Sequence, residues 1–483
     1  MESDSFQATT EAFLEWLSKI GVRINPKMTL KDLKSEGRGR GVVAAADFEE
    51  DEVVFCIPRT AVLNVNNVFA GQDSGASKEA LLQMPNWLAL TATMMSEGQQ
   101  SDSRWAPYLA VLPQKLDSLV FWSEEELAEL QASSVAKKIG RSSAEEMFTK
   151  HISPLGLGEF NVELCHQVAS VIMAYAFDIP EEEPAKQENG GAEGETDDLV
   201  SDDGEDEKTI LSMIPLADML NADAERNNAR IYYENEDLEM RTIKPIMAGE
   251  EIFNDYGQLP RSDLLRRYGY VTENYAQYDV VEISSASIKS LMTEKPQEIQ
   301  SGQFLDPLTS AEAEERVALA DREGILEDSY DVNIANAEER AIPDELLALL
   351  YLFLLDNENL EAIVTSQSAL PSRSKLATEL VGKVLVKVLR HREAEYATTL
   401  EEDEKLLQAA NLPRRTAMAI QVRHGEKRVL RLAVEEAMKF EAANKRMRPI
   451  RGSALNTAKN GSNLNNKRRA EEVSKPGKKG RLR

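Results

Sequence analysis

The chain shows a helical spacing of hydrophobic residues in several long segments. Between residues 8 and 20, apolar side chains such as Phe13 and Trp16 recur on one face, which predicts an amphipathic helix. Residues 160–177 predict a second helix, which is apolar on most of its surface. From residue 343 onward the spacing is helical almost throughout. The sequence therefore predicts a largely helical C-terminal region.

Strand patterns occur in two separate blocks. Residues 41–57 contain two short apolar runs around an acidic turn, and residues 230–256 contain three short apolar runs broken by turn residues. We therefore expect one strand block before residue 60 and a second between roughly 210 and 285. Helical patterns separate the two blocks, so the pattern predicts an α+β fold interrupted by a helical insertion.

Two segments of the chain differ from the rest in their charge. The chain has 483 residues, with 56 Lys+Arg against 83 Asp+Glu and a formal net charge of -27. Residues 181–208 carry -11 and almost no large apolar side chain, which predicts a disordered acidic insertion. Residues 467–483 carry +6, so the rest of the chain carries -22. A body this acidic repels nucleic acid phosphates and attracts basic macromolecules.

Several classes of protein are excluded by composition. Cys56 and Cys165 form no C-x-x-C pair, which argues against zinc fingers, iron–sulfur sites and a disulfide framework. The longest apolar run, residues 346–355, is about half a membrane span, and the N-terminus lacks the pattern of a signal peptide. We expect a soluble intracellular protein without membrane contact. No metal site is expected from the four histidines, which show no ligand spacing: His151, His166, His391 and His424.

The basic tail contains a candidate targeting signal. A first basic cluster at residues 467–469 is followed, after a short spacer, by a second at residues 478–481. Two clusters at this distance resemble a bipartite nuclear import signal, which would recruit an importin. The nucleus is therefore the expected location, with the cytoplasm as a second compartment. The alternative is a solvated basic tail without a partner.

Two segments carry candidate ligand-binding residues. Glycines alternate with arginines in residues 36–41, so the backbone there can approach a ligand closely. The segment leads into a strand rather than a helix, which argues against a dinucleotide-binding loop, and a glycine-rich hairpin is the alternative. In residues 214–223, a Pro-opened apolar turn leads to Asn221, whose side chain can donate and accept hydrogen bonds. Alone, Asn221 would more simply cap a short helix.

A third segment is rich in tyrosine. Seven of the chain's 12 tyrosines fall between residues 232 and 278, far more than uniform placement gives. They include the Tyr in the FNDYG motif of residues 253–257 and both tyrosines of the YGY motif of residues 268–270. An aromatic-walled site is one explanation, and strand packing is the other.

Taken together, the three segments resemble the SET domain of protein-lysine methyltransferases. Residues 103–127 are similar to the helical insertion of the Rubisco large-subunit methyltransferase class, and residues 396–428 to its C-terminal substrate-binding domain. The resemblance spans about residues 8–445 and is closest to the fungal ribosomal lysine methyltransferase 4 type.

The resemblance implies a fold and a domain arrangement. We expect a SET catalytic domain of short strands and small sheets over residues 1–285, split by a helical insertion at about 60–210. An all-helical substrate-binding domain would follow over residues 286–445, and a disordered basic tail over 446–483. We expect the protein to be a monomer.

The resemblance also assigns an activity and a site. The implied reaction is methyl transfer from S-adenosyl-L-methionine to a lysine of a basic protein, most simply a large-subunit ribosomal protein. Tyr256 would be catalytic. The cofactor-binding residues would be Arg38, Gly39, Arg40, Asn221, Ala222, Tyr256 and Tyr268. Tyr175 and Tyr268 would contact the substrate lysine.

One departure from the family concerns position 222, where most SET domains have His and this chain has Ala222. If the His contributes mainly backbone contacts to the cofactor, Ala can replace it, and if its side chain matters, cofactor binding is weaker. No cysteine-rich segment follows the SET motifs, so the helical C-terminal domain would close the site. A protein-histidine methyltransferase and a catalytically silent SET scaffold that binds a basic protein are the alternatives.

Overall fold

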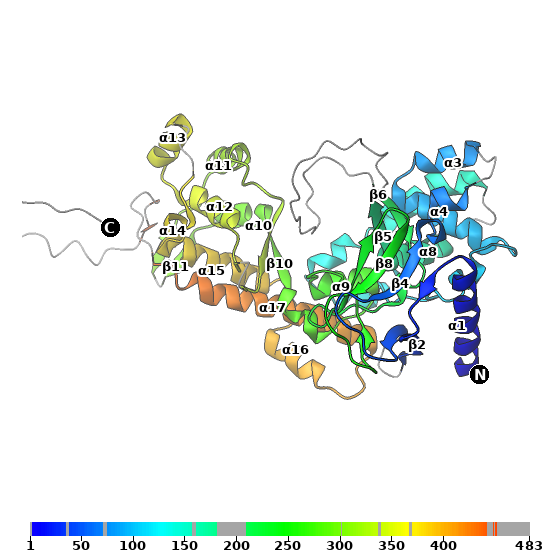
Figure 1. Cartoon of the computed structure of the whole chain (residues 1–483). Helices are drawn as coiled ribbons and strands as arrows, with labels where there is room; N and C mark the ends of the chain where they lie inside the picture. The colour runs from blue at the N-terminus through cyan, green and yellow to red at the C-terminus, as the bar shows by residue number, and fades with distance from the viewer. Residues whose placement is uncertain are drawn as a thin grey trace, which may run out of the picture. The chain divides into compact units, whose positions relative to one another are not determined.

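A computed structural model describes the chain over residues 2–34, 38–70, 75–156, 161–180, 209–300, 302–336, 340–366, 370–441, 448 and 450–451. The predicted acidic insertion and nearly all of the predicted basic tail lie outside the described residues. The chain divides into two compact units (Figure 1). The first combines Met1–Ser284 with Ser329–Pro343 and Val388–Ala437. The second combines Ser285–Asp328 and Asp344–Lys387 with the described part of Met438–Arg483.

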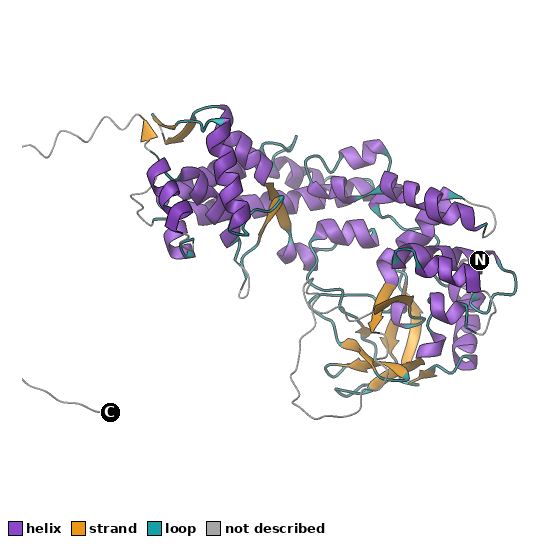
Figure 2. Ribbon diagram, turned by 90° about the horizontal axis from the view of Figure 1, so that it is seen from above, coloured by secondary structure: helices purple, strands orange, loops and turns teal. Residues whose placement is uncertain are grey.

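The first unit contains small antiparallel sheets (Figure 2). A four-stranded sheet has the order β1-β4-β8-β7 and a three-stranded sheet the order β2-β3-β9. Two-stranded pairs are formed by β5 with β6 and by β10 with β13. The bounds are β1 Arg23–Ile24, β2 Met28–Asp32, β3 Arg40–Ala44, β4 Val53–Pro58, β5 Ala176–Pro180, β6 Thr209–Met213, β7 Ala229–Tyr233, β8 Asp237–Thr242, β9 Glu251–Ile252, β10 Val280–Ser284 and β13 Ser329–Asn333.

These strands form where the sequence alternates. In β8, Leu238, Met240 and Thr242 are buried while the residues between them are partly exposed, as expected of a strand with one face on the core. Both predicted strand blocks are therefore confirmed. The ribbon β5–β6 pairs Pro180 with Thr209, so the chain leaves and re-enters the described region at neighbouring positions.

Helices surround these sheets within the first unit. Their bounds are α1 Glu2–Lys19, α2 Val65–Val68, α3 Gly75–Leu82, α4 Asn86–Gln99, α5 Ala106–Leu109, α6 Glu124–Ala128, α7 Arg141–Met147, α8 Val162–Tyr175, α9 Arg261–Tyr268, α16 Leu400–Leu407 and α17 Arg414–Ala437. The predicted N-terminal helix is α1, and its Trp16 donates a hydrogen bond to the carbonyl of Arg104 at 2.7 Å. The rings of Phe13 and Trp16 each stack with Tyr108 of α5, at centroid distances of 6.1 Å. These contacts fix α1 against the helical insertion.

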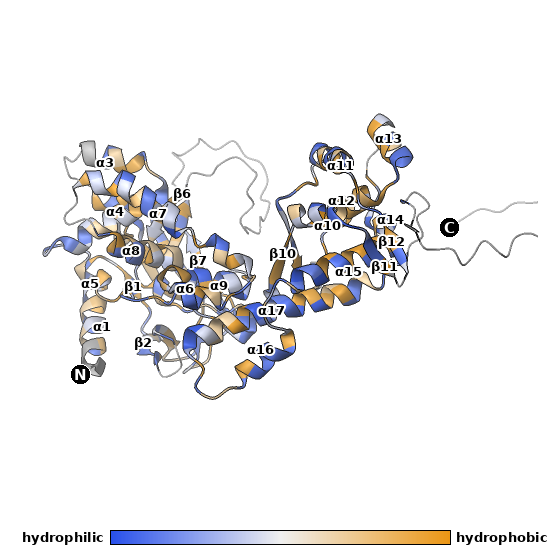
Figure 3. Ribbon diagram, turned by 180° about the vertical axis from the view of Figure 1, so that it is seen from behind, coloured by the Kyte–Doolittle hydropathy of each residue, from blue (hydrophilic) through white to orange (hydrophobic). Residues whose placement is uncertain are grey.

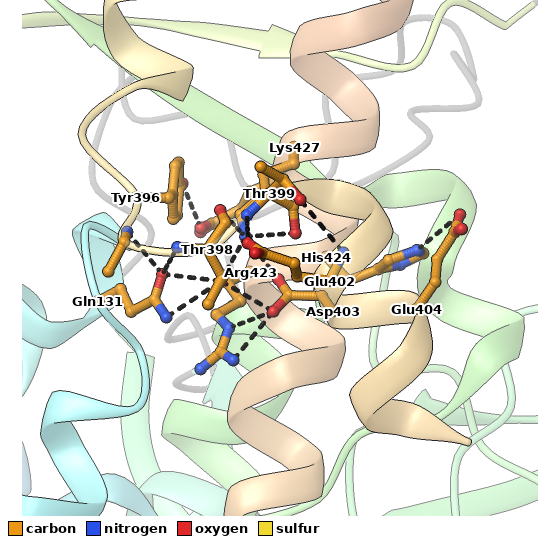
Figure 4. Close-up of polar contacts among 12 residues, drawn as sticks. Gln131, Tyr396, Thr398, Thr399, Glu402, Asp403, Glu404, Arg423, His424 and Lys427 are labelled. Atoms are coloured by element: carbon orange, nitrogen blue, oxygen red, sulfur yellow. Dashed lines mark hydrogen bonds and ion pairs between the residues drawn. The ribbon is translucent and has the colours of Figure 1, made fainter. Parts of the chain in front are cut away.

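A buried polar network joins the insertion to α16 and α17 in the same unit (Figure 4). Asp403 on α16 accepts a hydrogen bond from Lys427 at 2.5 Å and from Arg423 at 3.0 Å, and all three side chains are almost fully buried. Burial alone would raise the pKa of Asp403, but hydrogen bonds from Arg423 and Lys427 hold it below its ordinary value. Gln131 of the insertion accepts from the amides of residues 397 and 398. Removing one charge of such a network leaves others unpaired, so it holds these segments together.

The second unit is mainly helical. It contains α10 Ser285–Glu294, α11 Ser310–Arg322, α12 Asp344–Leu354, α13 Asn357–Ser366 and α14 Arg373–Leu376, and α15 Glu379–Glu393 begins in it. Residues 346–354 of α12 are buried on every side, and α12 is largely orange in Figure 3. An all-round apolar helix is expected at the centre of a helical unit. The apolar run that is too short for a membrane is thus a core helix.

The C-terminal region is helical as predicted, but it also contains strands. β11 (Gln297–Gln300), β12 (Gln303–Leu305) and β14 (Ile450–Arg451) form a three-stranded sheet, and β13 returns to the first unit. The all-helical description is corrected in this respect. Gly302 precedes β12 at φ 73°, a conformation that glycine adopts without strain, so this Gly was the local signal for the turn. Among the described residues, no helix is both long and apolar enough to cross a membrane.

Candidate active site

The glycine-rich segment runs past a cavity of the first unit. A Cβ added at Gly39 would meet no atom within 4 Å, so the backbone there is open to a ligand. Gly41 is the opposite case. A Cβ at this position would lie 2.4 Å from Leu33 Cδ1, 2.8 Å from Glu251 Oε1 and 3.2 Å from Asn221 Nδ2. Only glycine therefore allows β3 to pack this closely on its neighbours.

Arg40 anchors the same segment to α1 and to the helical insertion. Its guanidinium donates to Thr9 Oγ1 at 2.8 Å and to the carbonyl oxygen of Val111 at 3.1 Å. It also lies over the ring of Phe6, 4.5 Å from the centroid. Burial lowers the pKa of this guanidinium from its ordinary value. The side chain of Arg40 thus holds three segments of the chain in place around the cavity.

Asn221 reaches this segment from the turn after the short helix 217–219. Its Nδ2 donates to Glu251 Oε1 at 2.6 Å and to the Arg40 carbonyl at 3.4 Å. The other oxygen of Glu251 accepts a hydrogen bond from Arg38. The carbonyl of Asn221 accepts from the amide of Asn254 at 2.9 Å, and Ala222 forms a parallel bridge with Asn254. Two predicted site residues, Arg38 and Asn221, are therefore joined through a third residue.

These segments enclose a cavity of about 660 Å³, a size typical of cofactor and small-ligand sites. Its walls come from α1, the glycine-rich segment, the insertion, the end of α8 and the Asn221 turn. The lining residues are Phe6, Thr9, Lys34, Gly39, Arg40, Ala110, Val111, Leu112, Pro113, Gln114, Tyr175, Asp218, Met219 and Asn221. Gly39, Arg40, Asn221 and Tyr175 were predicted site residues, and the fold brings them together here.

The predicted tyrosines form an aromatic cluster beside this cavity. The rings of Tyr256 and Tyr268 stack at a centroid distance of 4.6 Å and an angle of 8°. Tyr270 lies against Tyr268 at 6.2 Å. The Tyr256 hydroxyl donates to the carbonyl of Leu220 at 3.2 Å, one residue before Asn221. The other predicted site residues do not line the cavity itself: Arg38, Ala222, Tyr256 and Tyr268.

Burial keeps these phenols neutral. It raises the pKa of Tyr256 well above its ordinary value, and the neighbouring hydroxyls of Tyr175, Tyr268 and Tyr270 add to the effect. Burial likewise raises the pKa of Tyr175 to about 12, with Asp218 as the next cause. At neutral pH each hydroxyl therefore remains a hydrogen-bond donor and is not a proton acceptor of useful strength.

Asp218 is a buried acid in the cavity wall. Its side chain accepts a hydrogen bond from the Tyr108 hydroxyl at 2.5 Å through Oδ2, while Oδ1 has no hydrogen-bond partner among the described residues. Burial raises the pKa of Asp218 to about 7, against a lowering by the Tyr108 hydrogen bond. The unsatisfied buried oxygen of Asp218 fits a ligand that donates a hydrogen bond at this point of the cavity wall.

Sequence reasoning missed three residues of this arrangement: Tyr108, Asp218 and Glu251. Asp218 stands inside the segment 214–223 and Glu251 two residues before the FNDYG motif of residues 253–257, but neither carries a signal beyond its residue type. Tyr108 lies 110 positions before its partner. Only the fold reveals these pairs. Among the described residues, no cluster of His, Cys, Asp and Glu could hold a metal ion.

Two protein families match this chain. Residues 39–257 match the SET domain, and residues 307–430 match the Rubisco LSMT substrate-binding domain. The described fold is also similar to solved structures of LSMT. One, the SET domain of LSMT bound to lysine and AdoHcy, gives a TM-score of 0.64 at 20% identity over 89% of this chain and 91% of that one. Another, Rubisco LSMT bound to AdoMet, gives a TM-score of 0.63 at 21% identity over the same shares.

Curated relatives are similar in sequence. The chain is 35% identical to ribosomal lysine N-methyltransferase 4 of Saccharomyces cerevisiae over 307 residues, which cover 60% of this chain and 61% of that protein. It is 28% identical to N-lysine methyltransferase setd6 of Xenopus laevis and 26% identical to SETD6 of Homo sapiens, over 88% of this chain and 94% of each relative. The chain thus combines a segment that matches the SET domain with one that matches the Rubisco LSMT substrate-binding domain, and the curated relatives to which it is similar are named lysine N-methyltransferases.

Proposed function

We propose that this protein transfers a methyl group from S-adenosyl-L-methionine to the side-chain amine of a lysine in a basic protein, most simply a ribosomal protein. The observation that carries the proposal is the cavity of about 660 Å³, in which Gly39, Asn221 and Tyr175 meet beside the Tyr256–Tyr268 stack. The open backbone at Gly39, the amide of Asn221 and the buried carboxyl of Asp218 suit a ligand that carries several hydrogen-bonding groups.

The cofactor supplies an activated methyl group on a sulfonium, and the chain must hold a neutral lysine of the substrate protein in line with it. For a lysine with an unperturbed pKa near 10.4, the neutral form costs about 4 kcal/mol at pH near 7.4. Desolvation lowers a lysine pKa because it penalises the charged form. The stacked rings of Tyr256 and Tyr268, with Tyr175, provide apolar walls for such desolvation.

Tyr256 has a positioning and electrostatic role in this scheme. Its raised pKa means that it does not accept the lysine proton, and its hydroxyl is held by the Leu220 carbonyl. The proton therefore leaves the ammonium for solvent as the side chain enters the aromatic walls. Most of the rate acceleration then comes from orientation and exclusion of water.

The substrate proposal rests on charge and on one relative's name. Outside the acidic insertion and the basic tail, the chain carries -22, which attracts cationic proteins. The similar yeast protein is named for a ribosomal lysine. We further propose that the basic tail recruits an importin and directs the protein to the nucleus, where it acts as a monomer.

The test is incubation of the purified protein with labelled S-adenosyl-L-methionine and isolated ribosomal subunits, followed by mass spectrometry of labelled bands. We expect a methylated lysine in a large-subunit protein, and labelling reduced roughly 10²–10³-fold with Tyr256→Phe. Label on histidine would support the histidine alternative. The absence of any labelled protein, from ribosomes and from whole cell extract alike, would support the silent scaffold and refute the proposal.

A further inference from the structure

Glu251 connects two predicted residues of the cofactor site. It lies on β9 opposite Val43 of β3, its side chain reaches back to Gly41, and this side chain is only 9% exposed. One carboxylate oxygen accepts from Asn221 Nδ2 at 2.6 Å, and the other accepts from Arg38. A single carboxylate therefore holds the side chains of two residues that are 183 positions apart in the sequence.

This contact decides how the amide of Asn221 is oriented. An asparagine side chain has one donor end and one acceptor end, and the two can exchange by a flip of the amide. Glu251 Oε1 and the Arg40 carbonyl are both acceptors, so only the NH₂ end can face them. The carbonyl end of Asn221, Oδ1, accepts no hydrogen bond from any other described residue, and Asn221 lines the cavity.

We propose that Glu251 is a positioning residue that locks the Asn221 amide with its carbonyl oxygen towards the cofactor cavity, so that the cavity selects a ligand that donates hydrogen bonds at this point. Under the proposed function, on which this inference rests, the donor is the α-ammonium of S-adenosyl-L-methionine. Arg38 has a supporting part, because its contact with the second oxygen fixes the plane of the Glu251 carboxylate.

The chemistry of the pair predicts the effect of each change. In Asn221→Asp, two carboxylates would face each other where a 2.6 Å hydrogen bond now lies, and like charges at this distance repel strongly. In Glu251→Gln, the side chain can present either end, so the orientation of Asn221 is no longer fixed. In the double variant the direction of donation reverses, because the new amide at position 251 donates to the new carboxylate at position 221. An acceptor oxygen directed into the cavity from position 221 is thereby restored.

The experiment is a double-mutant cycle with two readouts. Calorimetry measures the Kd for S-adenosyl-L-methionine, and thermal unfolding without ligand measures Tm, for the wild type, Asn221→Asp, Glu251→Gln and the double variant. We expect the Kd to rise roughly 100-fold in Asn221→Asp and about tenfold in Glu251→Gln. The double variant should recover to within about tenfold of the wild type. Recovery is incomplete because a carboxylate at position 221 cannot donate to the Arg40 carbonyl.

Glu250→Gln is the matched control, since Glu250 is the exposed neighbour and should leave Kd and Tm unchanged. Losses that simply add in the double variant, in Kd or in Tm, would overturn the inference. A Glu251→Gln protein that binds like the wild type would overturn it as well. If the wild type does not bind the cofactor, the proposed function fails instead, and the ligand-free Tm cycle still decides the role of Glu251.

Discussion

Asp218→Asn tests whether the wall of the cavity contains a buried acid that resists ionisation. Asp218 is 6% exposed, one of its carboxyl oxygens accepts from Tyr108 at 2.5 Å, and the other has no partner among the described residues. Burial raises its pKa from 3.8 to about 7 in the folded protein. A difference of about three pH units corresponds to about 4 kcal/mol between the two protonation states, as an upper value.

The direction in which the stability changes with pH follows from the number of protons that the folded and unfolded states bind. Between pH 4 and pH 7 the folded protein holds a proton on Asp218 that the unfolded chain has released. The contribution of this group to stability is therefore fully present below the unfolded pKa and is lost as the pH rises through the folded pKa of about 7. The asparagine introduced at position 218 keeps an acceptor for the Tyr108 hydroxyl but has no proton to lose. The variant should gain stability relative to the wild type as the pH rises.

Urea unfolding at pH 4, 5, 6, 7 and 8 measures this difference. Relative to the difference between the two proteins near pH 4, we expect the variant to gain about 1–2 kcal/mol of stability by pH 5 and about 2–4 kcal/mol by pH 8. Asp102→Asn is the control, because Asp102 is exposed and should leave the pH dependence unchanged. Parallel stability curves for the wild type and Asp218→Asn would refute the reasoning.

Three further predictions concern the site and its support. Tyr256→Phe should lower methyl transfer roughly 10²–10³-fold in a labelled-cofactor assay while the cofactor Kd stays within about threefold, because one hydroxyl is lost from a filled pocket. Gly41→Ala should raise the cofactor Kd at least about tenfold by calorimetry, because its Cβ would lie 2.8 Å from Glu251 Oε1. Asp403→Asn should lower the free energy of urea unfolding by about 3–5 kcal/mol, because Lys427 and Arg423 would lose their buried counter-charge.

Matched variants control for general disruption. Tyr233→Phe changes an exposed tyrosine and should retain full activity. Gly98→Ala adds a Cβ that meets nothing within 4 Å and should leave the cofactor Kd unchanged. Glu401→Gln breaks the exposed ion pair with Arg431 and should cost less than about 1 kcal/mol. Equal effects in any test variant and its control would contradict the corresponding prediction.

The fold was largely predictable because its motifs are local. The two short apolar runs of 41–57 and the glycine pattern of 36–41 lie within short stretches of sequence, and SET-type motifs recur in a fixed order. The short strands β11 and β12 were missed because a brief turn between polar runs competes with a strong helical pattern on either side. The turn glycine, Gly302, was the available signal.

The sequence predicted the residues of the candidate site that face the ligand, but it did not predict the residues that orient them. Asn221 and Tyr256 stand in recognisable motifs, whereas the partners that orient them come from distant positions. Glu251 meets Asn221 across 30 residues, and Tyr108 meets Asp218 across 110. Such pairs depend on sheet register and helix packing, which a single sequence does not encode in any local pattern.

The buried acid also bears on a conflict within the charge distribution. An acidic surface attracts lysine-rich proteins, but a negative field stabilises the ammonium and so opposes the deprotonation that methyl transfer needs. Within the site the chain reduces its own negative charge. The tyrosines remain neutral, and Asp218, the carboxyl in the cavity wall, has a pKa of about 7 and is therefore partly protonated near neutral pH. A lysine side chain that enters the aromatic cluster therefore moves from the negative field of the surface to surroundings with little negative charge. There its ammonium form is less stabilised, so the lysine loses its proton more easily.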